Sequence, residues 1–242
     1  MENRVEFKKI NLPATQGNYL KSRRLYRTDA PVKRLYKRRF LLAAEFILAF
    51  IALPTALYTG LIDFPKIPLL VALTLLCLAI LMGDPTFRIK NLYMVKRGVP
   101  VKKMLVRFAL TSPGVVALSL LLDPREFFFF PIQNTSTWLQ ILLLYPILSA
   151  LPQELIYRSF FFHRYKELFA DKALTVFTST LAFSFMHIIY GNIIAVTLPL
   201  AGGYFFSKTY IHTRSLLITS LEHALYGCLI FTVGLGRYFV NM

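Results

Sequence analysis

Long apolar stretches separated by short polar or basic segments dominate the chain. The hydrocarbon core of a bilayer is about 30 Å thick and needs roughly 20 apolar residues per helix, and most stretches approach that length. They run approximately over residues 40–59, 67–83, 105–122, 139–162, 173–190, 193–206 and 216–235. The pattern predicts an all-α protein, a polytopic transmembrane helix bundle of about seven spans, with six to eight as the range.

The sixth stretch, 193–206, is the shortest of the set. At about 14 residues it falls below the usual spanning length, so we expect a re-entrant or strongly mismatched segment there. The first stretch begins after a long basic arm and is long enough to span. It is therefore interpreted as an anchor rather than a cleavable signal peptide.

Composition agrees with a membrane location, since 56% of the residues are apolar and only 17% are charged. Basic residues concentrate in 1–38, 88–103 and 158–172, which fall on one side of the membrane under this span count. Because Lys and Arg in short loops favour the cytoplasmic side, we expect a multi-pass cell-membrane protein with a cytoplasmic N-terminus. Two parts are predicted: a basic cytoplasmic N-terminal arm, 1–38, and a transmembrane helical domain, 39–242.

The formal net charge of +16 could also indicate a nucleic-acid-binding protein. The basic residues, however, flank the apolar stretches and lie on no soluble fold that presents aromatic side chains. Attraction to anionic membrane lipid accounts for them more simply. We therefore expect membrane lipid as a partner and no nucleic acid.

Several polar residues lie inside the apolar stretches, where an ionisable group costs about 2.5 to 3.5 kcal/mol on insertion scales. They are Gln153, Glu154, Arg158, His187, Glu222 and His223. At ~1.5 Å of rise per residue, Glu154 and His223 come out ~13 Å and ~12 Å below the cytoplasmic surface, and His187 nearer ~20 Å. We predict that Glu154, His187 and His223 converge on one mid-membrane cavity.

Local spacing adds a second prediction around Glu154. Glu154 and Arg158 are four residues apart on one helix face, with the acid on the N-terminal side, and are expected to form an ion pair. Pro146 and Pro152 precede them and should kink the helix and free backbone carbonyls, which suits a cavity. Taken alone, the pair is equally compatible with a structural role, and a single intramembrane histidine is more often a packing residue.

Three motifs in this half of the chain resemble those of one family. The segment from Gln153 to Arg158 is similar to the Glu-Glu-x-x-x-Arg motif of the CPBP family, which comprises CAAX prenyl proteases of type II and bacteriocin-processing proteins. Phe183 to His187 matches its Phe-x-x-x-His motif, and His223 to Gly227 resembles its His-x-x-x-Asn motif. The order also agrees, and the resemblance covers residues 139–238.

The resemblance implies an intramembrane endopeptidase that hydrolyses a peptide bond near the chain end of a lipidated or hydrophobic peptide, as in CAAX-box protein processing. In the family a motif-one Glu and the second-motif His activate a water, and the last motif stabilises the oxyanion. Carried over, Glu154 and His187 would activate the water and His223 would stabilise the oxyanion. Supporting roles would fall on Gln153, Arg158, Phe183, Glu222 and Gly227.

Two positions depart from the family pattern. Gln153 stands where the first Glu is expected, and because an amide cannot accept a proton at useful pH, Glu154 would have to act as the base. Gly227 stands where the Asn is expected, and loss of an oxyanion donor costs about 10² to 10³ in rate. Gln153 could act as a substitute donor. Glu222 is a reserve carboxylate, although it points about 100° away from His223 around the helix.

A cofactor and two rival functions stay open at this point. Glu154, His187 and His223 could supply three ligands to a divalent metal such as zinc with an open fourth position, although no HExxH signature is present. One rival is a catalytically silent CPBP-like membrane protein that acts by binding, as in immunity. The other is a proton-coupled transporter, which would also bury Glu and His mid-membrane but usually shows paired repeats with broken helices.

Overall fold

A computed structural model describes residues 34–93, 101–169 and 171–240. The chain divides into two units, Met1–Ala44 and Glu45–Met242, and each is described by itself. In the first unit, residues 34–44 are helical. Most of the basic arm predicted over 1–38 therefore lies outside the described residues.

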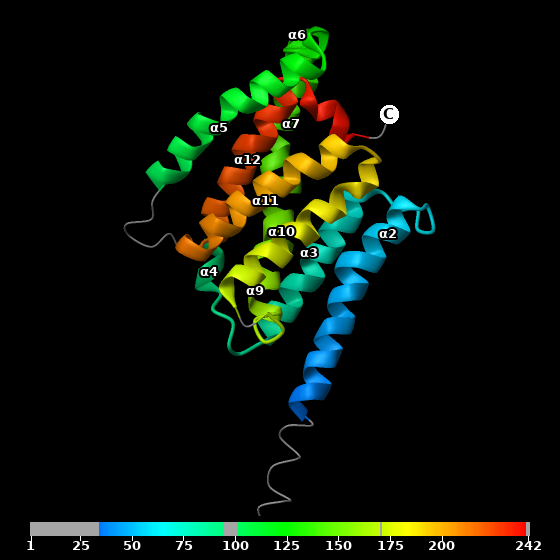
Figure 1. The fold of residues 1–242 in the computed structure, drawn as a ribbon, viewed down its shortest axis with the longest axis vertical. Helices are drawn as coiled ribbons and strands as arrows, with labels where there is room; N and C mark the ends of the chain where they lie inside the picture. Colours follow the sequence, from blue (N-terminus) through cyan, green and yellow to red (C-terminus); the bar gives the residue numbers. More distant parts are fainter. Residues whose placement is uncertain (1–33, 94–100, 170, 241–242) are drawn as a thin grey trace, which may run out of the picture. The chain divides into compact units, whose positions relative to one another are not determined.

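The regular secondary structure described in the second unit is all helical, and no strand occurs among the residues that the structure describes. Its α-helices are α2 (Leu53–Tyr58), α3 (Lys66–Gly83), α4 (Lys90–Tyr93), α5 (Val101–Leu122), α6 (Phe129–Gln133), α7 (Thr135–Tyr145), α8 (Leu151–Glu154), α9 (Phe161–Arg164), α10 (Lys172–Met186), α11 (Ile193–Thr213) and α12 (Leu216–Thr232). Helices α10, α11 and α12 pack side by side (Figure 1). The all-α prediction is confirmed.

Five helices within the described part of the chain are long and apolar enough to cross a membrane by length and composition. These are Arg34–Tyr58, Lys66–Gly83, Val101–Leu122, Thr135–Arg164 and Lys172–Tyr190. Helix α12 is apolar as well but has only 17 residues. A multi-pass arrangement is supported, whereas the predicted count of seven spans is not confirmed.

Helix α11 corrects the prediction for the sixth apolar stretch. It has 21 residues and continues to Thr213, well past the end of the short segment expected over 193–206. The extension carries Ser207, Thr209 and Tyr210, whose side chains are buried. Polar residues that find partners inside the bundle continue the helix, and an apolar-run criterion does not detect them.

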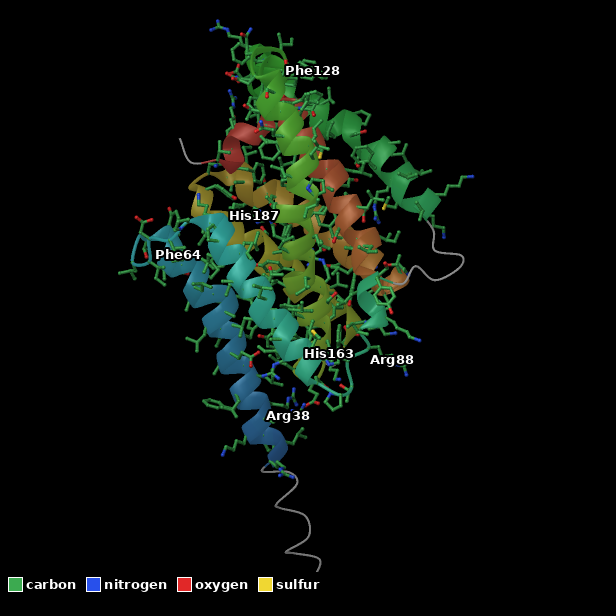
Figure 2. The ribbon with its side chains drawn as sticks, turned by 180° about the vertical axis from the view of Figure 1, so that it is seen from behind. Arg38, Phe64, Arg88, Phe128, His163 and His187 are labelled. Atoms are coloured by element: carbon green, nitrogen blue, oxygen red, sulfur yellow. The ribbon has the colours of Figure 1, made fainter. Side chains whose placement is uncertain are left out.

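Labelled side chains mark the two ends of the second unit. Arg88 and His163 lie at one end and Phe128 at the other, while His187 lies between them, nearer the level of Phe64 (Figure 2). The sequence likewise placed the basic 88–103 segment on the cytoplasmic side. Which end faces the cytoplasm remains a prediction.

The long helix Thr135–Arg164 changes its winding twice. The wider π-helical turns Pro146–Ala150 and Leu155–Phe160 interrupt it on either side of α8. Pro146 has no N–H to donate, and its ring crowds the preceding turn, which favours a change of winding at this position. The helix changes its winding at Pro146 but continues to Arg164, and Glu154 lies between two irregular turns of the kind that often occur at functional sites.

Candidate active site

The site is built outward from a fully buried ion pair between Glu154 and Arg158. Arg158 Nε lies 3.1 Å from Glu154 Oε2, which confirms the pair predicted from their spacing. The two atoms are at ion-pair distance without an aligned hydrogen bond. Arg158 also donates to Ser179 Oγ at 2.7 Å and to the Gly203 carbonyl at 3.2 Å. The cation is thereby fixed against α10 and α11 and compensates the buried carboxylate.

The second oxygen of Glu154 contacts a histidine on α12. Glu154 Oε1 lies 3.0 Å from Nδ1 of His223. An ionised carboxylate can only accept, so Nδ1 of His223 carries the hydrogen of this bond. The other ring nitrogen, Nε2, lies 2.9 Å from the hydroxyl of Tyr145. Phe206 stacks on the imidazole with 4.7 Å between ring centroids, and the ring is therefore held on three sides.

His187 follows the last residue of α10 and is held by the backbone of the preceding turn. Its Nδ1 lies 2.7 Å from the carbonyl oxygen of Phe183. Because a carbonyl oxygen only accepts, Nδ1 carries the hydrogen, and in the neutral ring the lone pair is on Nε2. His187 lines the large cavity of the bundle. It is a side chain able to take a proton from a water there.

The cavity has a volume of about 1200 Å³ and is lined mainly by apolar and aromatic side chains from α3, α5, α7, α10, α11 and α12. Its polar side chains include five from three helical segments, Thr135–Arg164, Lys172–Tyr190 and α12. They are Tyr145, Ser149, Gln153, His187 and His223. An apolar chamber with a few convergent polar groups is the usual form of a small-molecule or peptide site. This one can hold an extended hydrophobic chain.

The structure brings together most of the residues singled out from the sequence, in different ways. Gln153, His187, His223 and Gly227 line the cavity together with Phe183. Glu154 is not among the lining residues of that cavity and reaches it through His223. Glu154 therefore lies behind the histidine instead of facing the cavity beside His187.

Glu222 belongs to a separate buried pair, although it is adjacent to His223. Its Oε1 accepts from Nε of Arg107 at 2.9 Å, and Arg107 also donates to Thr209 Oγ1 at 2.6 Å. Neighbouring residues of a helix point about 100° apart, which turns Glu222 toward α5 and α11. Sequence reasoning passed over Arg107, although a buried carboxylate in a span does require a cation.

Two further residues of the site were also missed. Tyr145 bonds to His223, and Ser149 Oγ accepts from Nε2 of Gln153 at 2.8 Å. Neither residue belongs to a motif, and neither carries the large insertion cost that marks a charged residue in an apolar stretch. The only local signal was the adjacent Pro146, which marks where the helix changes its winding.

The histidines do not form an evident metal centre with Glu154. Among the described residues, no group of three or more His, Cys, Asp or Glu side chains is placed to share a metal ion. Glu154 Oε1 is taken by His223, and Oε2 faces Arg158. The zinc ligand set considered from the sequence therefore does not fit this arrangement, and no chemical step is derived through a metal.

Residues 135–229 match the family model described as type II CAAX prenyl endopeptidase Rce1-like. The matched segment contains the motifs around Glu154, His187 and His223, and it confirms the resemblance to the CPBP family drawn from them. Neither the curated proteins nor the solved structures gave a match to this chain.

Proposed function

We propose that this chain, whose residues 135–229 carry the Rce1-like match, is an intramembrane endopeptidase that cleaves near the end of a lipidated or hydrophobic peptide. The observation that carries the proposal is the state of His187. Its Nδ1–H is bound to a backbone carbonyl, which leaves a lone pair on Nε2 in a largely apolar cavity that it shares with His223. A neutral imidazole with one free nitrogen is the usual general base of a hydrolase.

In this proposal His187 activates a water for attack on the scissile carbonyl. Nε2 takes one proton from the water while its oxygen bonds to the carbonyl carbon. The C–N bond then breaks, and the protonated His187 returns the proton to the leaving amine, which gives a carboxylic acid and a free amine. His223 lines the same cavity, and hydrogen-bond donors in the cavity wall would stabilise the oxyanion that forms on the carbonyl.

Glu154 then acts through His223 and not on the water. The sequence resemblance gave Glu154 a share in water activation, whereas its bond to Nδ1 supports a positioning role. A buried carboxylate behind an imidazole fixes its tautomer and stabilises the imidazolium when it forms. Arg158 keeps that carboxylate tolerable in a membrane interior.

A catalytically silent member that acts by binding is the second candidate, and Gln153 is the observation that favours it. The Gln153 side chain lies in the cavity wall and donates to Ser149. It has no proton-accepting group where the family has a carboxylate. The cavity could still hold a hydrophobic chain without cutting it.

The two candidates separate in one assay. The purified protein in lipid nanodiscs is given a quenched fluorescent peptide with a farnesylated cysteine followed by three residues, with and without a chelator. Release of the terminal tripeptide, lost in His187→Ala, supports the peptidase, and the chelator arm decides the metal requirement. Saturable binding without release supports the silent member. A peptide that is neither bound nor cut contradicts both.

A further inference from the structure

Tyr145 holds the position in the cavity wall next to His223. It is the last residue of α7, its hydroxyl lies 2.9 Å from His223 Nε2, and it lines the cavity. Its ring also packs edge-on against Phe231, with 5.6 Å between centroids. The phenol is thus held between a buried histidine and the cavity space.

Gly227 supplies the space for that ring. It lies one helical turn after His223 on α12, and a Cβ built there would overlap the Tyr145 ring. Its backbone is not in the left-handed region, so glycine is not needed for conformation. Glycine inside a helix costs about 1 kcal/mol relative to alanine. Close approach of Tyr145 is the feature of the structure that accounts for it.

Three side-chain contacts in series connect a buried cation to the cavity surface. They join Arg158 to Glu154, Glu154 to His223, and His223 to Tyr145. With His223 neutral, Tyr145 donates to Nε2. With His223 protonated, Nε2–H donates to the phenol oxygen, and the phenol O–H is then free to point into the cavity. Glu154 accepts from Nδ1 of His223 in both forms.

We propose that Tyr145 is a catalytic residue whose phenol O–H hydrogen-bonds the oxyanion formed on the substrate carbonyl. The proposal rests on the peptidase function above. Tyr145 reaches the site only because Gly227 has no side chain, at the position where the family resemblance expects an asparagine. No covalent bond to the phenol forms, and its proton stays on oxygen.

The test compares four variants with the wild type on the farnesylated peptide. Tyr145→Phe removes only the hydroxyl and should lower kcat about 10²- to 10³-fold with little change in KM. Gly227→Ala displaces the ring and should lower kcat to a similar extent. The double variant should lose no more than the worse single one, because both changes act on one group. Tyr210→Phe, which alters a buried tyrosine packed on Phe162 outside the cavity, is the control and should keep full activity.

The measurements distinguish failure of the peptidase function from failure of the role of Tyr145. A wild type that does not cleave the peptide overturns the peptidase function and this role with it. A wild type that cleaves, with Tyr145→Phe equally active, overturns the role of Tyr145 alone. A Tyr145→Phe variant that raises KM and leaves kcat unchanged also overturns it, since that pattern reports ground-state binding. Thermal melting of each variant checks folding, and because Tyr145→Phe adds no atoms, it decides the matter if Gly227→Ala does not fold.

Discussion

Two buried carboxylates in this bundle have nearly the same local chemistry and different surroundings. Glu154 and Glu222 are both fully buried, and each is paired with an arginine. The arginine of Glu154 is four residues away on the same chain segment and completely buried. The arginine of Glu222 is on α5, 115 residues away in sequence, and its side chain is 27% exposed.

What separates the two is the group on the other side of each pair. Glu154 contacts His223, and His223 lines the cavity. Arg107, the partner of Glu222, continues to Thr209 on α11. One carboxylate thus acts on a cavity-lining imidazole, whereas the other ties α12 to α5 and α11.

The largest expected effect is on turnover, in the matched pair Glu154→Gln and Glu222→Gln. Glu154→Gln should lower kcat by about 10³-fold or more, because an amide cannot support the imidazolium of His223. Glu222→Gln should keep its turnover. Initial rates on the farnesylated peptide, with thermal melting alongside, make the measurement. If Glu154→Gln is fully active and Glu222→Gln is not, the assignment of the two carboxylates is wrong.

The second expected effect is on the free energy of unfolding, which should fall by different amounts when Arg158 and Arg107 are replaced. Arg158→Met leaves the Glu154 carboxylate buried without a cation and should cost about 3 to 5 kcal/mol. Arg107→Met should cost less, because the Arg107 side chain is 27% exposed and its pair with Glu222 is less completely enclosed. Unfolding in detergent, followed by the loss of helical signal, compares them. A larger loss for Arg107→Met would show that the α5 contact, and not the cavity pair, dominates the stability of the bundle.

A smaller gain is expected from restoring the family pattern in the cavity wall. Gln153→Glu places a carboxylate where it can contact water, and a positioned base contributes about 10² to 10⁴ in rate where none acts. Since His187 already serves as base in our proposal, the gain should be at most about tenfold. Gln153→Met is the matched control and should give none. A Gln153→Glu gain above a hundredfold would mean that the present chain lacks an effective base.

The smallest effect concerns a carboxylate outside the spans. The Thr86 hydroxyl, followed by His163, holds the pKa of Asp84 well below the usual carboxyl range. A lowered folded-state pKa stabilises the fold above the ordinary carboxyl pKa, and the contribution is lost as the pH falls through the lowered value. Asp84→Asn should therefore melt slightly below wild type at pH 7, with a gap that closes in acid. A gap independent of pH would assign the effect to the amide substitution itself.

The sequence by itself determined the helical, membrane-type architecture, the resemblance to the CPBP family and the Glu154–Arg158 pair. Each follows from local information: apolar runs, motif spacing, and the rise and rotation of one helix. An irregular turn before Glu154 could also be predicted, because Pro146 lacks the N–H that a regular helical turn uses. Helix lengths were predicted less accurately. Helix α11 extends beyond its apolar stretch because buried polar residues continue a helix without adding hydropathy.

Only the tertiary structure decided which groups meet across helices. Glu154 and His223 are 69 residues apart, and Tyr145 and His223 are 78 apart. Whether such side chains meet depends on how each helix is rotated about its axis and on which residues are small enough for close approach. Gly227 illustrates the point: in the sequence it is a departure from a motif, and in the structure it is the space that Tyr145 occupies. The spacing of residues along one helix determines neither that rotation nor the close approach, because both depend on the surfaces of two packed helices.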